Sequence, residues 1–403
     1  MSKPLEGIRV VELSTYVAAP VCARLLADLG ADVIKVERPE GDAWRATGVG
    51  YHPERYSADE NPVFDIYNSG KKHLALNLKA PEGMAAFHRL LETADVFITN
   101  TRPAALKRLR LSYEDIKDKY PRLVYGIVLG YGEKGPDADK PAFDTSAFWA
   151  RCGFLRDQAP IGENYEPVQP PYSMGDTFTG GLLMGEVCAA LLRREKTGKG
   201  DLVRSSLFHN GVFSMGTMAI INQSPYESMM PRDRASWGAP SGSYRCADGE
   251  WIYISGYSSK MYPPTYEMLG LENLAENPKF ADGPSRYANR HEYYEIIRNA
   301  FLQKPSAYWL EKGKELDLPM TRMGHYSDLS KDEQAWANGY VEEVVSPNGR
   351  MNVMPSSPIE MESVGKLTTK VAPAVGTDTN VILSELGYTA EQIKAMTDSG
   401  AVK

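Results

Sequence analysis

Ile8-Arg-Val-Val-Glu-Leu13 and Asp32-Val-Ile-Lys-Val-Glu37 are two short runs rich in β-branched residues, which is typical of buried strands. Between them, residues 21–29 carry apolar side chains at helical spacing, and Gly30 follows as a helix stop. A strand, a helix and a second strand in this order predict a βαβ unit with parallel strands.

The same alternation continues toward the middle of the chain. The pattern predicts strands over 73–78, 96–99, 123–129 and 201–207, and helices over 81–94, 103–108 and 176–195, the last one closed by Thr197-Gly-Lys-Gly200. Strands that alternate with helices favour an α/β fold built on a Rossmann-like, doubly wound parallel sheet.

Composition changes after about Asn222, which indicates a second domain. Residues 224–239 are rich in Pro, Ser and Met and are interpreted as a linker, and residues 243–254 read as a hairpin that turns at Asp248-Gly249. Residues 240–328 are expected to form a smaller inserted α+β domain with helices over 262–269, 291–302 and 306–316. Residues 330–403, with a strand over 340–345 and a helix over 377–386, are too few to stand alone and are expected to complete the large domain of residues 1–223.

Charge and cysteine usage narrow the function. The net charge is −7 and both signs are interspersed, so neither nucleic acid nor a membrane surface is the expected partner. The four cysteines, Cys22, Cys152, Cys188 and Cys246, are far apart and predict neither disulfides nor a zinc site. With no signal-peptide core and no membrane span in the sequence, we expect a cytoplasmic protein.

Several common catalytic motifs are missing from the sequence. The first strand-to-helix turn, Ser14–Pro20, has no glycine to admit a dinucleotide pyrophosphate, and the chain has no phosphate-binding P-loop. The six histidines have no metal-ligand spacing, and no G-x-S-x-G elbow occurs. Arg38, which directly follows a strand, suits a phosphate such as that of a phosphorylated adenosine, although an isolated arginine at a strand end is more often surface decoration.

Asp176 lies in Tyr172-Ser-Met-Gly-Asp-Thr-Phe-Thr-Gly-Gly181, where a loop enters a glycine-rich helix. One interpretation is a helix N-cap, held ionised by backbone N–H groups and the helix dipole. The other is a nucleophile, because the small residues beside it leave room for an acyl thioester. The spacing does not decide between them.

Beyond these motifs, the chain resembles the class III CoA transferases of the formyl-CoA and carnitine-CoA type over nearly its whole length. The resemblance rests on residues 4–13 and 27–39, Asn77-Leu-Lys79, Tyr131–Pro136, Met174-Gly-Asp176 and Thr197–Gly200. It implies that Asp176 is the catalytic nucleophile and carries an aspartyl-CoA thioester. It also implies coenzyme A as a substrate, no permanently bound cofactor, no metal, and an interlocked homodimer.

The resemblance also assigns CoA-binding positions. They are Val17, Ala18, Ala19, Arg38, Asn100, Arg108, Lys140 and Asp144. Ala18 stands where formyl-CoA transferase has a glutamine, and Ser236–Gly242 lacks that enzyme's glycine-rich lid. The oxyanion donors are expected at Gly180-Gly181 or near Gly242.

A narrower resemblance to bacterial transferases of 2-hydroxy acids, such as phenyllactate or 2-hydroxyisocaproate, rests on residues 132–137, Phe143-Asp144, 147–151 and 332–338. It implies amino-acid fermentation, a 2-enoyl-CoA donor, a 2-hydroxy acid acceptor and a 2-hydroxyacyl-CoA dehydratase as the next enzyme. An apolar acyl pocket is expected from four aromatic side chains, those of Phe148, Trp149, Phe154 and Tyr172, although such rings are also common in cores.

Three further functions stay open at this point. A racemase of the same fold needs a histidine where Phe143 stands, which disfavours proton abstraction. A transferase for succinate-type or carnitine-type acids is the second, and a CoA-binding subunit without activity is the third. The intact Met-Gly-Asp176 motif argues against the inactive subunit.

Overall fold

The structure is a computed structural model that describes residues 3–46, 61–159, 166–224, 233–256 and 258–403. The chain forms two compact units. The larger unit comprises Met1–Phe154, Pro170–Gly216 and Ser330–Lys403, and the smaller comprises Leu155–Gln169 and Thr217–Leu329. Residues 155–169 and 217–223 therefore belong to the smaller unit, whereas the sequence interpretation placed them in the large domain. Half of the expected linker of residues 224–239, namely residues 225–232, lies outside the described residues.

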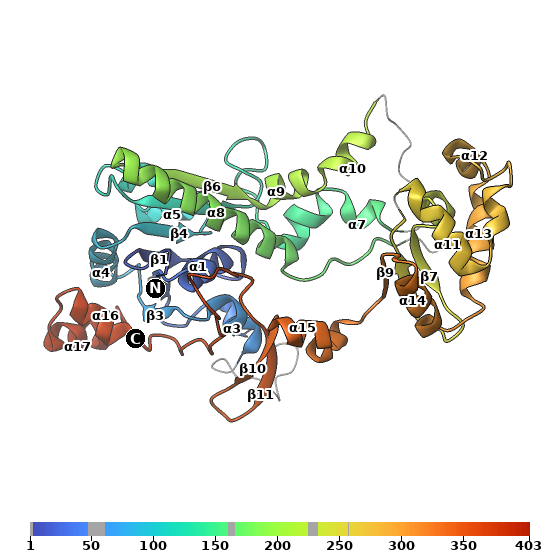
Figure 1. Cartoon of the computed structure of the whole chain (residues 1–403). Helices are drawn as coiled ribbons and strands as arrows, with labels where there is room; N and C mark the ends of the chain where they lie inside the picture. The colour runs from blue at the N-terminus through green and yellow to red at the C-terminus, as the bar shows by residue number, and fades with distance from the viewer. Residues whose placement is uncertain (1–2, 47–60, 160–165, 225–232, 257) are drawn as a thin grey trace. The chain divides into compact units, whose positions relative to one another are not determined.

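The larger unit is built on a parallel sheet of six strands in the order β3-β2-β1-β4-β5-β6 (Figure 1). The strands are β1 (Arg9–Leu13), β2 (Asp32–Glu37), β3 (Lys72–Ala75), β4 (Val96–Thr99), β5 (Val124–Leu129) and β6 (Leu202–Ser206). This order is that of the dinucleotide-binding fold, in which the chain reverses its direction of growth between β1 and β4. The predicted doubly wound parallel sheet is confirmed.

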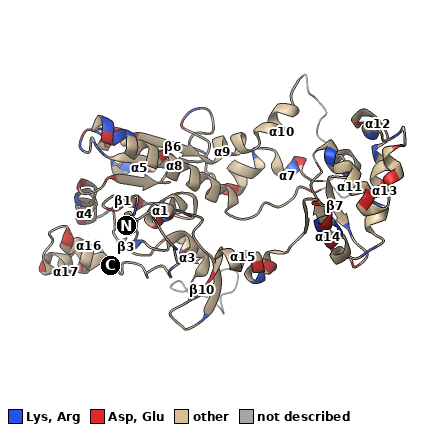
Figure 2. Cartoon of the chain, viewed as in Figure 1, with Lys and Arg blue, Asp and Glu red and all other residues tan. Residues whose placement is uncertain are grey.

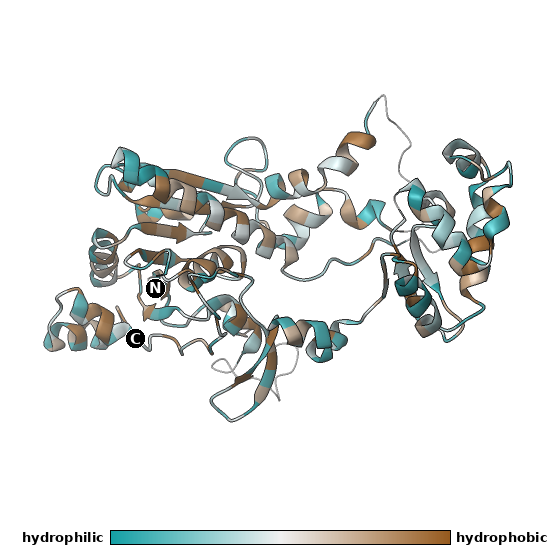
Figure 3. Cartoon of the chain, viewed as in Figure 1, coloured by the Kyte–Doolittle hydropathy of each residue, from teal (hydrophilic) through white to brown (hydrophobic). Residues whose placement is uncertain are grey.

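Helices cover both faces of this sheet because neighbouring residues of a strand point to opposite sides. Val10 of β1 packs with α1 (Ala18–Asp28) and α8 (Met174–Thr197), and Val11 packs with α4 (Pro81–Glu92), α5 (Pro103–Leu109) and α6 (Tyr113–Ile116). Apolar residues concentrate on the central strands (Figure 3). Each face thus forms its own core.

The last segment of the chain completes the second of these cores. Ile382 and Leu383 of α16 (Thr379–Glu385) and Met396 of α17 (Ala390–Asp398) pack into it. Leu76, just after β3, forms an antiparallel bridge with Val402. The predicted completion of the sheet domain by the C-terminal segment is confirmed.

Shorter elements complete the larger unit. They are α3 (Pro62–Asn68), η1 (Ala43–Ala46), the π-helical η2 (Asp144–Ala150), α9 (Leu207–Ser214), α15 (Glu333–Asn338) and the hairpin of β10 (Val341–Val345) and β11 (Met351–Pro355). Three further elements cross the boundary between the units, namely α7 (Phe154–Asp157), α10 (Gly216–Ile221) and η6 (Tyr326–Lys331).

The smaller unit is α+β, as predicted. Its antiparallel sheet has the order β7-β8-β9, with β7 (Gly242–Arg245), β8 (Trp251–Ile254) and β9 (Met320–Arg322). Its helices are α11 (Tyr262–Leu269), α12 (Gly283–Ala288), α13 (Arg290–Phe301), α14 (Ser306–Glu315), η3 (Arg234–Trp237), η4 (Ser259–Met261) and η5 (Glu272–Ala275). Tyr244, Ile252 and Phe301 are buried at its centre.

Residues of both charge signs are scattered over the elements of each unit (Figure 2). Among the helices that the structure describes, none combines the length and the apolar character needed to cross a bilayer.

Candidate active site

Two cavities in the larger unit share Thr15, which follows β1, and Thr101, which follows β4. Ligands of open α/β sheets bind beyond the carboxyl ends of the strands, where the strand order reverses, and β1 and β4 are that point here. The cavities have volumes of about 520 and 550 Å³. The position of a binding site therefore follows from the topology.

We name the cavities after the charged residues that they contain. The Arg38 cavity is lined by Leu13, Ser14, Thr15, residues 36–42, residues 76–79, Thr101 and Leu109. The Asp176 cavity is lined by residues 15–18, 100–105, Arg108, 128–130, 138–143, Asp176 and Leu207.

The structure brings most of the residues assigned by sequence resemblance to this region. Five of them, Val17, Ala18, Asn100, Arg108 and Lys140, line the Asp176 cavity together with Asp176. Arg38 lines the adjoining Arg38 cavity. Ala19 is fully buried inside α1 and Asp144 is buried next to α8, and neither is among the residues that line the Arg38 cavity or the Asp176 cavity.

Asp176 is the third residue of α8, so the N-cap interpretation is wrong. The N-cap is Ser173, whose φ of 63° lies in the left-handed region and whose side chain makes no capping bond. A residue inside the first turn projects outward from the helix, and the Asp176 carboxyl group accordingly opens on the cavity.

Burial raises the pKa of Asp176 to about 7, and the nearby negative charge of Asp144 adds to the rise. The sequence predicted a carboxylate that backbone N–H groups and the helix dipole hold ionised, and both burial and the Asp144 charge act against that ionisation. Burial also raises the pKa of Asp144. The Trp149 indole and the backbone N–H groups at the start of α8 lower the pKa of Asp144 and so act against the effect of burial. None of these groups makes a hydrogen bond of good geometry to the Asp144 carboxyl group.

Two glycines of α8 let other groups approach closely. A methyl group on Gly175 would overlap Asp144 Oδ1, and one on Gly180 would overlap the carbonyl oxygen of Ala18 in α1. Gly180 and Gly181 lie inside α8, where each backbone N–H donates a hydrogen bond to the carbonyl four residues earlier. These N–H groups are not free to stabilise an oxyanion, so the prediction of oxyanion donors at these two glycines is wrong. Gly242, the other expected donor, belongs to the smaller unit.

The turn after β1 forms the wall that the two cavities share. The Thr15 N–H donates to Asn100 Oδ1 at 3.0 Å, and Asn100 Nδ2 donates to the Thr15 carbonyl at 2.6 Å. Tyr16 has a φ of 65°, a left-handed conformation that costs a non-glycine residue roughly 1–2 kcal/mol. Asn100 thus supports a strained turn with both ends of its amide, in addition to the CoA-binding position that the resemblance assigned to it.

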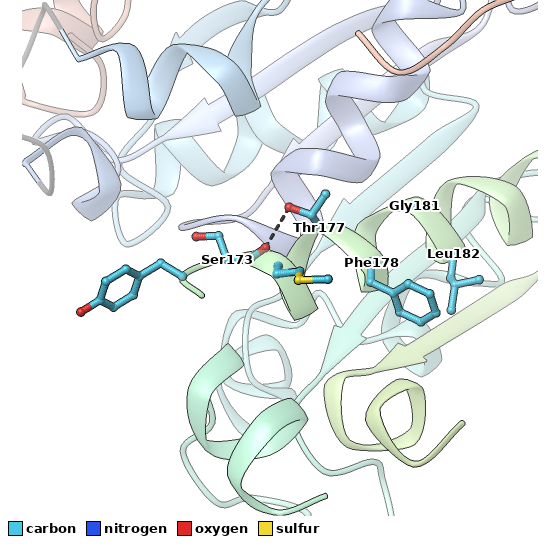
Figure 4. A pocket seen from close by; sticks show the side chains of 7 residues that line it. Ser173, Thr177, Phe178, Gly181 and Leu182 are labelled. Atoms are coloured by element: carbon cyan, nitrogen blue, oxygen red, sulfur yellow. Dashed lines mark hydrogen bonds between the residues drawn. The ribbon is translucent and has the colours of Figure 1, made fainter. Parts of the chain in front are cut away.

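The expected acyl pocket is not formed by its four aromatic rings. Phe148 and Trp149 are buried in the protein, and the Trp149 ring packs against Phe154 with centroids 4.7 Å apart. Tyr172 is 77% exposed and lines a different, shallow apolar hollow on the outer side of α8. Figure 4 shows this hollow, where Thr177 Oγ1 donates to the Ser173 carbonyl and Phe178 and Leu182 form the apolar side.

The structure adds residues that the sequence interpretation missed. Phe143 is 57% exposed and lines the Asp176 cavity, with its ring edge-on to Tyr16 at 5.4 Å. Tyr67 of α3 has its hydroxyl near the side chains of Ser173 and Thr177, and burial raises its pKa. Lys79 joins Arg38 in lining the Arg38 cavity. Phe143 and Lys79 each had a signal in the sequence, as parts of the motifs Phe143-Asp144 and Asn77-Leu-Lys79, whereas the position of Tyr67 depends on tertiary packing.

The Asp176 pKa gives a testable pH dependence. If ionised Asp176 is the reacting form, kcat/KM should rise with pH with a midpoint near 7. Asp144→Asn should move this midpoint to lower pH, because it removes the like charge but leaves the burial unchanged. The measurement is the pH profile of kcat/KM for both proteins. Asp201→Asn, which changes a surface carboxylate paired with Arg193, is the control and should leave the midpoint in place. An unchanged midpoint in Asp144→Asn would contradict the assignment.

Among the residues that the structure describes, no group of three or more His, Cys, Asp or Glu side chains could hold a metal ion. These walls carry the Asp176 carboxyl group, the cations Arg38, Lys79, Arg102, Arg108 and Lys140, and four further acids, Glu37, Glu40, Asp42 and Asp139. Glu37 and Asp42 are paired with the buried cations Arg45 and Lys35. Such a surface suits an anionic ligand with a carbonyl carbon that a carboxylate can attack.

Comparison with known proteins agrees with this chemistry. The chain is 37% identical over 401 residues to (R)-2-hydroxy-4-methylpentanoate CoA-transferase of Clostridioides difficile, covering 99% of both chains. It is 32% identical to cinnamoyl-CoA:phenyllactate CoA-transferase of Clostridium sporogenes, covering 97% of this chain and 95% of that one. A crystal structure of Rv3272 from Mycobacterium tuberculosis superposes with a TM-score of 0.82 at 26% identity, covering 94% of this chain and 99% of that one. The family model described as CoA-transferase family III matches residues 5–379, and the chain therefore belongs to that family.

Proposed function

We propose that this enzyme transfers CoA from a 2-enoyl-CoA to a 2-hydroxy carboxylic acid through an aspartyl-CoA thioester on Asp176. The observation that carries the proposal is the Asp176 carboxyl group on a cavity wall that also presents Arg108 and Lys140. The two similar transferases support the substrate class, because both are named for a CoA transfer that involves a 2-hydroxy acid.

The reaction proceeds in two halves. Asp176 attacks the donor thioester carbonyl, the C–S bond breaks, and a mixed anhydride and CoA thiolate result. The thiolate attacks the Asp176 carbonyl and releases the donor acid, which leaves the aspartyl-CoA thioester. The acceptor carboxylate then attacks this thioester and expels CoA thiolate, which attacks the acceptor carbonyl of the second anhydride and releases Asp176.

The environment of Asp176 favours this role. Burial raises the pKa of the carboxyl group to about 7, so its ionised form is held with little hydration. A poorly hydrated carboxylate of higher basicity is a better nucleophile than an ordinary surface carboxylate. No ATP is needed, because one thioester is exchanged for another.

The cations of the two cavities are proposed to bind the CoA molecule. In this arrangement Arg38 and Lys79 face the nucleotide end, and Arg108 and Lys140 lie along the path toward Asp176. Arginine pairs with phosphate oxygens through two N–H groups, and lysine adds a compact charge. CoA is long and carries its phosphates at one end. In the proposed pose it extends from one cavity to the other past the wall that they share at Thr15 and Thr101.

The product also implies a following reaction. A 2-hydroxyacyl-CoA can lose water to give a 2-enoyl-CoA, which is the proposed donor. We therefore propose that a 2-hydroxyacyl-CoA dehydratase consumes the product and regenerates the donor after each cycle. A homodimer is proposed for the functional enzyme on the strength of the family resemblance.

A chromatographic transfer assay tests the proposal. Acetyl-CoA, cinnamoyl-CoA, isocaprenoyl-CoA and succinyl-CoA are each offered with (R)- and (S)-2-hydroxy acids, succinate and carnitine. Transfer from an enoyl-CoA to a 2-hydroxy acid is the expected result. Preference for succinyl-CoA and a dicarboxylate would contradict the proposed 2-hydroxy acid substrates and identify a succinate-type transferase. Exchange of the α-proton in deuterated water without CoA transfer would favour the racemase.

A further inference from the structure

A fully buried charge network lies beneath the turn after β1. It consists of Glu12 in β1, Lys35 in β2, Asp42 after β2 and Lys71 before β3, and none of these side chains is exposed. Lys35 Nζ lies 2.9 Å from Glu12 Oε1 and 3.0 Å from Asp42 Oδ2, and Lys71 Nζ lies 2.7 Å from Glu12 Oε2. Two acids and two bases balance in formal charge.

The network binds the backbone of residues 14–20, the segment that carries the wall between the two cavities. Lys35 Nζ donates to the Ser14 carbonyl at 3.0 Å, and Lys71 Nζ donates to the Pro20 carbonyl at 2.9 Å. Asp42 Oδ1 accepts from the Tyr16 N–H at 3.2 Å. The strained Tyr16 is thus held between a network contact on each side along the chain.

Stability alone does not explain this design. Removing ions from water is costly, and apolar residues of the same volume often give a more stable core. A buried ionic network whose backbone contacts converge on a strained turn at a ligand cavity is better explained by the conformation that it imposes.

Asp42 also belongs to the other cavity. The loop of residues 36–42 lines the Arg38 cavity, and the Asp42 N–H donates to Glu37 Oε2 at 2.9 Å. The Asp42 side chain reaches from this loop to Tyr16, which lines the Asp176 cavity. One side chain therefore joins the walls of both cavities.

We propose that Asp42, held by Lys35, is a positioning residue that couples occupation of the Arg38 cavity to the shape of the Asp176 cavity. A ligand end bound at Arg38 fixes the loop of residues 36–42, and Asp42 passes this constraint to the turn that faces the acyl group. The inference rests on the proposed function in taking acyl-CoA as the ligand of both cavities.

The test compares acyl-CoA with acyl-pantetheine, which lacks the nucleotide and cannot occupy the Arg38 cavity. In the wild type, binding energy from the nucleotide should raise kcat as well as lower KM. Asp42→Ala should lower kcat/KM for acyl-CoA by about 10- to 100-fold but kcat/KM for acyl-pantetheine by less than about 3-fold. Only acyl-CoA occupies the Arg38 cavity, so only acyl-CoA loses the effect of that occupation on the Asp176 cavity. Equal losses for the two substrates would overturn the proposal.

Two further variants separate positioning from stability. Asp42→Asn keeps an oxygen that can accept from Tyr16 and should retain part of the acyl-CoA advantage. Arg24→Met breaks another buried ion pair, to Asp28 at 2.8 Å in α1, and should leave the ratio of the two substrates unchanged. A change of that ratio in Arg24→Met, or no retention in Asp42→Asn, would contradict the proposal.

Binding measurements keep the two proposals distinguishable. If the wild type moves CoA to none of the acids, the proposed function fails, and calorimetric Kd values for CoA and pantetheine then replace the kinetic ratio. A weaker preference for CoA in Asp42→Ala than in the wild type is the expected result. An unchanged preference would overturn the coupling.

Discussion

Asp176→Asn is expected to lower CoA transfer by at least about 10³-fold while the protein still folds and binds CoA. Asparagine has nearly the same shape as aspartate, so the packing at the start of α8 is kept, but its amide cannot form the anhydride or the thioester. In the wild type, hydroxylamine added after acyl-CoA should convert Asp176 to a hydroxamate, which mass spectrometry of the peptide detects. The variant should give no such adduct.

The same substitution is expected to stabilise the protein at alkaline pH. The pKa of Asp176 is raised from 3.8 to about 7 in the folded protein, so the wild type loses stability as the pH rises through this window. The loss of folding stability is complete above about pH 7 and, at 1.36 kcal/mol for each pKa unit, amounts to on the order of 3 to 5 kcal/mol. The melting temperature of Asp176→Asn should therefore exceed that of the wild type at pH 8 by more than at pH 5.

Asp176→Ala provides the control, because alanine cannot revert to aspartate by deamidation. Transfer that survives in Asp176→Ala would eliminate the aspartyl intermediate. A melting-temperature difference that does not grow with pH would instead show that Asp176 is not desolvated in the folded protein.

Gly180→Ala is expected to destabilise the protein by about 1–3 kcal/mol and to reduce transfer. Its methyl group would overlap the Ala18 carbonyl and lie 2.7 Å from Val21 Cβ, and backbone atoms of α1 cannot move aside without moving the helix. Asp176 lies about one turn away on the same face of α8, and Ala18 lines its cavity, so a shift of either helix changes the site.

Gly185→Ala is the matched control in the same helix. A methyl group on Gly185 would meet no atom within 4 Å. Replacing an exposed helical glycine by alanine should stabilise the protein by roughly 0.5–1 kcal/mol. Urea denaturation of the two variants should therefore give changes of opposite sign, and destabilisation by both would show that close approach of α1 and α8 is not the cause.

The sheet could be predicted from the sequence because its signals are local. The β-branched runs at β1 and β2 and the apolar spacing of α1 are each contained in fewer than about a dozen residues. By contrast, β9 was missed because it is only three residues long and takes its partner from β8, about 70 residues earlier in the chain.

The proposed nucleophile, Asp176, could be singled out only as part of a recognised motif, since its spacing alone also fitted a helix cap. Its raised pKa could not be predicted, because it depends on burial and on Asp144, which comes from another element. For the same reason Phe148 and Trp149 fitted an acyl pocket in sequence but pack in the interior. Asp42 carried no signal at all, as its role depends on a contact with Tyr16 across 26 positions.

The bridge between Leu76 and Val402 bears on how the chain acquires its structure during synthesis. One face of the sheet is closed by α16 and α17, whose residues leave the ribosome after the whole smaller unit has been made. Until then Leu74 and Leu76 lack part of their apolar cover, and contacts spanning more than 300 positions must form last. Nascent chains that stop short of α16 are therefore expected to need a chaperone to stay unaggregated.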